Sequence, residues 1–107
     1  MSKTLKPYAA IKVTSAGQFT IHGELTFDTV QQLNIRGCQL IDASPLPIFD
    51  CKQVSNSDNS GLALILSWIK YAKSVHKSIQ FFNIPPQLLA IAKVSGLQDI
   101  ALKTNKA

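Results

Sequence analysis

Hydrophobic and polar residues alternate in two short stretches near the start of the chain. In "AIKVTSAGQFTIHGELTF" (residues 10–27), Phe19 and Ile21 flank the polar Thr20. A period of two residues is typical of a strand with one buried face, and Ala16-Gly17 supplies a bend between two such stretches. The pattern therefore predicts two short strands connected by a turn.

The apolar spacing then changes to that of a helix. In "TFDTVQQLNIRGCQLI" (residues 26–41), either Thr26 or Asp28 can cap the first turn, although Gly37 is unfavourable in a helix interior. The apolar residues near one face of this predicted helix are Val30, Leu33 and Leu40.

The second half of the chain contains two further predicted strands and two helices. "PLPIFDCKQV" has the apolar character of a buried central strand, and "KSIQFFNI" is another strand. Between them a helix runs from about Ser60 to Val75. A last helix, "PPQLLAIAKVSGL", begins at Pro85-Pro86 and stops at Gly96, and "QDIAL" is either a short strand or a tail.

The order β-β-α-β-α-β-α predicts an α/β domain with helices packed on one face of a sheet. At 107 residues the chain is long enough for one core, and 46% hydrophobic with 16% charged residues is typical of a compact domain. We expect a single domain over residues 1–107, with an ordered core from about 8 to 102. The sequence contains no internal repeat or linker.

The net charge of +5 changes this picture little, because part of it lies near the termini, at Lys3, Lys6, Lys103 and Lys106. No dense basic run with interleaved aromatic residues is present, so we expect no nucleic-acid partner. A modest attraction to acidic proteins or anionic lipid surfaces is compatible with this charge. The two cysteines lack metal or redox spacing and are interpreted as buried thiols in a reducing compartment.

The N-terminus "MSKTLKPYAAIKV" has no apolar segment of the kind found in signal peptides. The most apolar run, Leu62 to Ile69, is too short to span a bilayer. We therefore expect a cytoplasmic protein.

Residues that carry chemistry are scattered. No phosphate loop, dinucleotide-binding motif or metal-ligand spacing is present, and His22 and His76 are interpreted as surface residues. Six acidic residues fall on different predicted elements: Glu24, Asp28, Asp42, Asp50, Asp58 and Asp99. We expect no catalytic residue, metal, cofactor or small-molecule substrate, and thus no enzyme.

The start of the helix after "NSDNS" is more informative. All five residues are good helix caps, yet capping requires only one of them. The free N–H groups and partial positive charge of a helix N-terminus also suit an anion or a phosphoserine.

Two apolar stripes run along this same helix. Leu62, Ile65, Leu66 and Ile69 are spaced to pack on the sheet, whereas a second stripe contains Leu64, Trp68, Tyr71 and Val75. Two interpretations of the second stripe remain open: it packs on neighbouring helices, or it belongs to a protein-binding surface anchored by Trp68 and Tyr71.

A polar loop followed by Asp58-Asn59-Ser60-Gly61-Leu62 at the start of an apolar helix resembles the signature loop of STAS domains, the family of anti-sigma-factor antagonists. "IHGELTFDTV" resembles the second strand and first-helix entry of that family, and "PIFDCKQV" its central strand. "GLALILSWIKYAKS" and "LLAIAKVSGLQD" are most similar to the MlaB-type branch, the cytoplasmic STAS subunit of a phospholipid-transport ABC complex in Gram-negative bacteria. The resemblance covers nearly the whole chain in matching order.

The resemblance implies one STAS-like domain with a mixed sheet, helices mainly on one face and no enzymatic activity. It implies binding to the ATPase subunit of an ABC transporter that maintains outer-membrane lipid asymmetry, and attachment to the inner membrane through that complex. The expected partner-binding residues are Asp58, Asn59, Ser60, Gly61, Leu64 and Trp68.

In the antagonist branch, the residue after the loop aspartate is a Ser or Thr that a partner kinase phosphorylates. Here that position holds Asn59, which cannot be phosphorylated, and Ser57 and Ser60 are out of register. MlaB-type domains carry a Thr there that contacts the ATPase, and Asn59 retains hydrogen-bonding capacity without the methyl group. The alternative is an anti-sigma-factor antagonist or related signalling protein that binds a kinase-like partner at the same loop.

Overall fold

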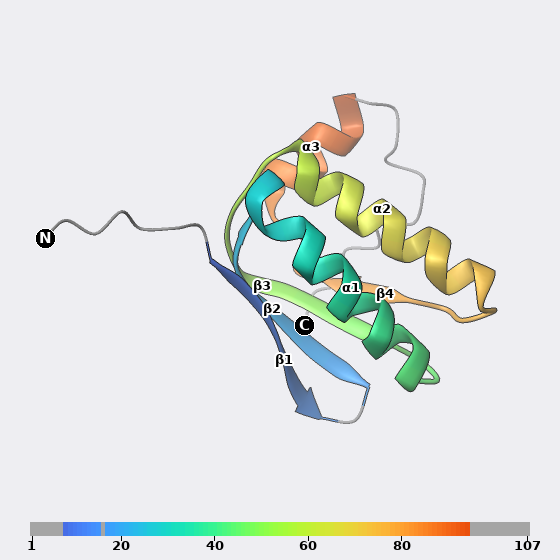
Figure 1. The fold of residues 1–107 in the computed structure, drawn as a ribbon. Helices are drawn as coiled ribbons and strands as arrows, with labels where there is room; N and C mark the ends of the chain where they lie inside the picture. Colours follow the sequence, from blue (N-terminus) through green and yellow to red (C-terminus); the bar gives the residue numbers. More distant parts are fainter. Residues whose placement is uncertain (1–7, 16, 95–107) are drawn as a thin grey trace, which may run out of the picture.

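The computed structural model describes residues 8–15 and 17–94. In this part of the chain, four strands form one mixed sheet, and the helices lie on one side of it (Figure 1). In chain order the elements are β1 (Ala9–Ser15), β2 (Gln18–Leu25), α1 (Phe27–Ala43), β3 (Ile48–Ser57), α2 (Asn59–Ser74), β4 (Gln80–Phe82) and α3 (Pro86–Val94). The predicted α/β fold and order of elements are confirmed.

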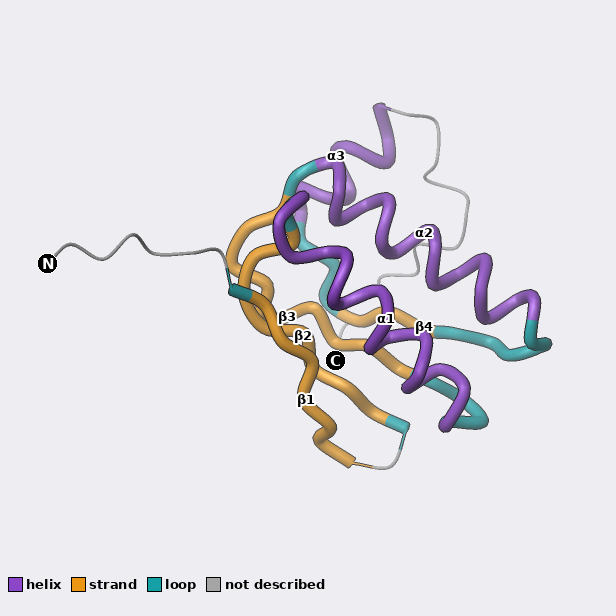
Figure 2. Tube along the Cα trace, in the orientation of Figure 1, coloured by secondary structure: helices purple, strands orange, loops and turns teal. Residues whose placement is uncertain are grey.

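The strands lie in the order β1-β2-β3-β4. β1 pairs with β2 in antiparallel orientation, whereas β2–β3 and β3–β4 are parallel pairs. Parallel neighbours need a crossover connection, which α1 and α2 provide. Figure 2 shows these helices side by side over the sheet, so one face of the strands is covered.

Aromatic rings from three strands and one helix meet in the core. The Phe49 ring on β3 lies 4.7 Å from the Trp68 ring, 5.2 Å from that of Phe19 and 5.8 Å from that of Phe81, measured between centroids. All four side chains are buried. Aromatic contacts of this kind contribute beyond the area they bury, and they tie α2 to the centre of the sheet.

Element boundaries differ from the predicted ones at three places. β3 continues to Ser57, because its end pairs with the end of β2 at Leu25. β4 is limited to Gln80–Phe82, and α2 covers 59–74 rather than 60–75. Ala16, Gly96, Asp99, "QDIAL" and the expected limit near residue 102 lie outside the described residues.

Side-chain hydrogen bonds join the C-terminal half of α1 to Tyr71 of α2 and to Lys77, which follows α2. The Lys77 ammonium donates to the carbonyl oxygens of Ile41 and Asp42 at 2.8 and 2.7 Å, and these belong to the last turn of α1. The Tyr71 hydroxyl is 2.7 and 2.8 Å from the two carboxylate oxygens of Asp42. These bonds hold the two helices together at the end opposite to the Asp58 loop.

Candidate partner-binding site

The loop that contains Asp58 lies where two strands end and two helices begin. Leu25, the last residue of β2, pairs with Ser57, the last residue of β3. The Asp58 amide then donates to the Leu25 carbonyl at 3.1 Å. The N-termini of α1 and α2 therefore lie at the same end of the sheet (Figure 1).

Asp58 is the residue that caps α2. Its backbone is extended, and its carboxylate accepts a hydrogen bond from the Ser60 amide at 2.8 Å. Its carbonyl also accepts from the Gly61 amide at 3.0 Å. With one residue assigned to capping, the exposed Asn59 in the first turn is available for contact with another molecule.

Gly61 is required by close packing beneath the first turn of α2. A Cβ atom at this position would lie 2.2 Å from the Ser57 hydroxyl and 3.0 Å from the Leu25 Cβ. Ser57 itself is 6% exposed. A kinase therefore cannot reach the Ser57 hydroxyl unless this end of the domain opens, whereas Ser60 is half-buried.

The prediction that Leu64 and Trp68 lie on an exposed surface is wrong, although Leu64 lines the groove described below. Leu64 is 3% exposed and Trp68 0%. The indole stacks on Phe49, and its N–H lies 3.4 Å from the Asn34 carbonyl on α1. Because α1 packs against this side of α2, Leu64 and Trp68 are part of the core, and the half-buried Tyr71 and Val75 pack against it, as the first of the two interpretations holds.

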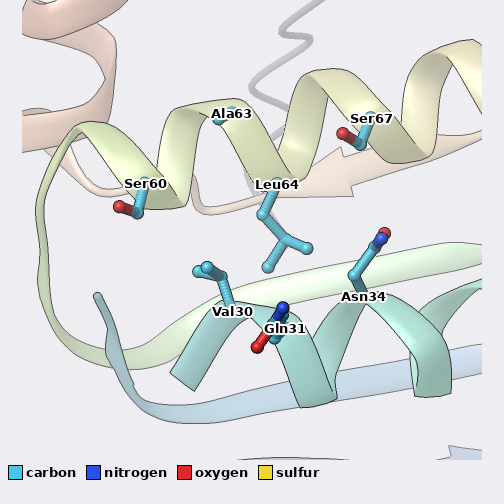
Figure 3. A pocket seen from close by; sticks show the side chains of 7 residues that line it. All are labelled: Val30, Gln31, Asn34, Ser60, Ala63, Leu64 and Ser67. Atoms are coloured by element: carbon cyan, nitrogen blue, oxygen red, sulfur yellow. The ribbon is translucent and has the colours of Figure 1, made fainter. Parts of the chain in front are cut away.

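A groove between α1 and α2 begins beside the Asp58 loop. Its cavity volume is about 220 Å³, and Figure 3 shows side chains of both helices converging on it. The lining residues are Val30, Gln31, Asn34, Ser60, Ala63, Leu64 and Ser67. Ser60 thus belongs both to the predicted contact loop and to the groove.

The sequence did not predict that α1 forms one side of this groove. Phe27 is 79% exposed and Ile35 64% exposed. Together with Gln31 they are spaced i, i+4, i+8, so they follow one line along α1. The signal was available, since these residues fall outside the Val30, Leu33 and Leu40 face that packs inward.

The described residues contain no group of three or more His, Cys, Asp or Glu side chains placed to hold a metal ion. Burial, and secondarily the Asp50 charge, raises the pKa of the Cys51 thiol to about 12. Partial burial and Asp42 also raise the pKa of Cys38. Because the thiolate is the reactive form of cysteine, neither residue is prepared to act as a nucleophile.

The interpretation of the cysteines as buried thiols holds for Cys51, whereas Cys38 is only half-buried. Separately, none of the helices within 8–15 and 17–94 combines the length and hydrophobicity needed to cross a bilayer.

Solved structures with the same fold include two anti-sigma-factor antagonists. The unphosphorylated form of SpoIIAA is 22% identical and has a TM-score of 0.66, with 85% of this chain and 83% of that chain covered. The antagonist from Mycobacterium paratuberculosis is 14% identical, with a TM-score of 0.70 and coverage of 90% and 83%.

A third similar structure is the murine Solute Carrier 26 family member A9 anion transporter, at 17% identity and a TM-score of 0.58. That match covers 77% of this chain and 14% of the transporter. At such identities these similarities show the fold alone.

At the level of sequence, no curated protein matches the chain. The family model described as MlaB, STAS domain, matches residues 11–103, which include every strand and helix described above except the first residues of β1. The chain therefore belongs to the MlaB-type STAS domain family.

Proposed function

We propose that this chain is a non-enzymatic subunit that binds and supports the ATPase of an ABC-type phospholipid transport system. In this role it lies on the cytoplasmic side of the inner membrane, held there by the complex, and serves outer-membrane lipid asymmetry. The observation that carries the proposal is the match to the MlaB-type STAS family over residues 11–103. STAS domains in general are binding or regulatory modules, and they mediate protein–protein contacts in transporters as well.

The N-terminus of α2 supports this proposal. Asn59 is exposed in the position where the signalling branch carries a phosphorylatable hydroxyl, and the neighbouring Ser57 is enclosed. A contact made through Asn59 does not require phosphate to be added or removed. Such a permanent contact suits a subunit of a complex better than a protein that alternates between partners.

The alternative is an anti-sigma-factor antagonist or related signalling protein that binds a kinase-like partner at the same loop. Its support is the fold similarity to two such antagonists. Genomic neighbours separate the two functions. Genes for an ABC permease, an ATPase and a substrate-binding protein favour transport, whereas a sigma factor and its kinase favour signalling.

Substitution of Asn59 by Arg tests the proposed contact directly. An Arg side chain placed in a protein interface without a matching acid loses hydration, and we expect the Kd for the purified ATPase to rise at least about tenfold. Ser74→Arg, exposed at the other end of α2, is the control and leaves the Kd within about twofold. The measurement is isothermal titration calorimetry. Equal binding by wild type and both variants would place the contact elsewhere on the molecule, and no binding by the wild type would refute the proposed function.

A further inference from the structure

The residues that line the groove between α1 and α2 follow helical spacing. On α2 its lining residues are Ser60, Ala63, Leu64 and Ser67, spaced i, i+3, i+4, i+7, and opposite them on α1 lie Val30, Gln31 and Asn34. This spacing follows one side of α2 over about two turns and one side of α1 over little more than one turn. Figure 3 shows Leu64 pointing toward α1, while Ser60, Ala63 and Ser67 follow one another along α2. The groove thus runs along both helices.

None of the lining residues carries an ionisable side chain, although the whole chain has a net charge of +5. The exposed Lys70 and Lys73 of α2 do not belong to the lining. A charged occupant would lose its hydration here without gaining a counter-charge. The side-chain amides of Gln31 and Asn34 can form neutral hydrogen bonds. The groove therefore suits an uncharged occupant.

The size of the groove favours part of a macromolecule over a small ligand. Its volume of about 220 Å³ is below the range of about 300–1,000 Å³ that is typical of small-molecule pockets. It accommodates a few side chains of a larger partner. On α1, the exposed Phe27 and Ile35 extend the apolar area along the line that contains Gln31.

We propose that a helix of the partner ATPase packs over this groove and inserts uncharged, mainly apolar side chains between α1 and α2. The inference rests on the proposed function and adds α1 to the interface, through Phe27, Gln31 and Ile35. The small side chains of Ser60, Ala63 and Ser67 allow a helix backbone to come close, and an amphipathic helix in an apolar groove is a recurrent form of recognition. Ser60 makes the groove continuous with the Asp58 loop.

Two neighbouring glutamines on α1 provide a matched test. Gln31 and Gln32 are both exposed, but only Gln31 lines the groove. We expect Gln31→Arg to raise the Kd for the purified ATPase at least about tenfold, because it places a long charged side chain in an otherwise uncharged groove. Gln32→Arg should leave the Kd within about twofold. Ile35→Ser, which removes exposed apolar area, should weaken binding in the same direction as Gln31→Arg. Circular dichroism and urea unfolding verify that each variant is folded.

The outcomes separate this inference from the proposed function. If the wild type binds the ATPase and Asn59→Arg weakens binding, but Gln31→Arg binds as Gln32→Arg does, the groove is not occupied and the proposed function stands. If the wild type does not bind the ATPase, both are refuted. Analytical ultracentrifugation of the chain alone tests another occupant. A dimer that Gln31→Arg dissociates would assign the groove to a second copy of this chain and overturn the inference.

Discussion

The indole of Trp68 occupies the space that Gly37 leaves open on α1. A Cβ atom at Gly37 would lie 2.3 Å from two carbon atoms of the indole. Glycine in a helix interior is normally less favourable than alanine by about 1 kcal/mol. At this position the contact between α1 and the buried Trp68 requires it.

We predict that Gly37→Ala destabilises the domain by roughly 1–3 kcal/mol, because the added methyl group overpacks the contact with the indole. Helix propensity alone would give the opposite sign, a stabilisation of about 1 kcal/mol. Urea unfolding measures the difference. Gln39→Ala, on the exposed side of the same helix, serves as control and changes stability by less than about 0.5 kcal/mol. A stabilised Gly37→Ala protein would show that α1 and α2 are not in this close contact.

For individual residues, the sequence indicated which apolar residues share one side of α2 but not which element covers that side. Helical spacing grouped Leu64 with Trp68 correctly, since both lie on one side of α2. Whether that side faces solvent or α1 depends on how closely α1 can approach, and the close approach is possible because Gly37 has no side chain. The position of Asn59 was predictable because a cap and its helix are local in sequence, and its binding role remains a prediction.

Between elements, the position of α1 relative to α2 depends on bonds at both ends. The Asp58 amide contacts the end of β2, and Lys77 contacts the last turn of α1. Lys77 supplies a positive charge and two donated hydrogen bonds at a helix C-terminus, where carbonyl groups have no partner within the helix.

We predict that Lys77→Met lowers the free energy of unfolding by about 1–2 kcal/mol, because two carbonyl groups of α1 lose a charged donor. Lys73→Met removes an exposed charge from the last turn of α2 and should cost less than about 1 kcal/mol. Chemical denaturation of the two variants in the same buffer gives the comparison. Equal losses would mean that the contact of Lys77 with α1 adds nothing beyond a surface charge.

The elements themselves were largely predictable, and their ends were less so. Hydrophobic periodicity identified every strand and helix of the described residues, and Thr26, one of the two predicted caps, precedes α1. The extension of β3 to Ser57 was not predictable, because "SNS" has no strand pattern and is held by pairing with β2. The groove between α1 and α2 depends on packing between segments that are distant along the chain, so it could not be predicted from the sequence either.

For the molecule as a whole, the buried Cys51 thiol links stability to pH. Its pKa is about 12 in the folded chain against an ordinary value of 9.0, mainly because of burial. A thiol that loses its proton more readily when unfolded stabilises the fold fully below pH 9.0. That contribution decreases as the pH rises from 9.0 toward 12.

We therefore predict that the free energy of unfolding decreases above pH 9.0, with Cys51 contributing up to about 1.4 kcal/mol per pH unit. Cys51→Ala should show a shallower decrease across this range, even if it is less stable overall. The raised pKa values of Cys38 and Tyr71 affect both proteins equally and therefore cancel in the comparison. Denaturation curves at several pH values give the two slopes, and identical slopes would contradict the assignment to Cys51.

The parallel pairing of β2 and β3 affects how this chain folds and whether a short peptide can reproduce the Asp58 loop. The pairing joins Gln18 to Ile48 and brings Leu25 beside Ser57 across the whole of α1. Closing a loop of this length costs about 3 kcal/mol of chain entropy before any contact compensates for it. We therefore expect the Asp58 loop to form late in folding, because it is assembled from segments that are distant along the chain. A linear peptide of residues 55–70 lacks the Leu25 carbonyl that orients the loop and would be a poor competitor for any partner of the folded domain.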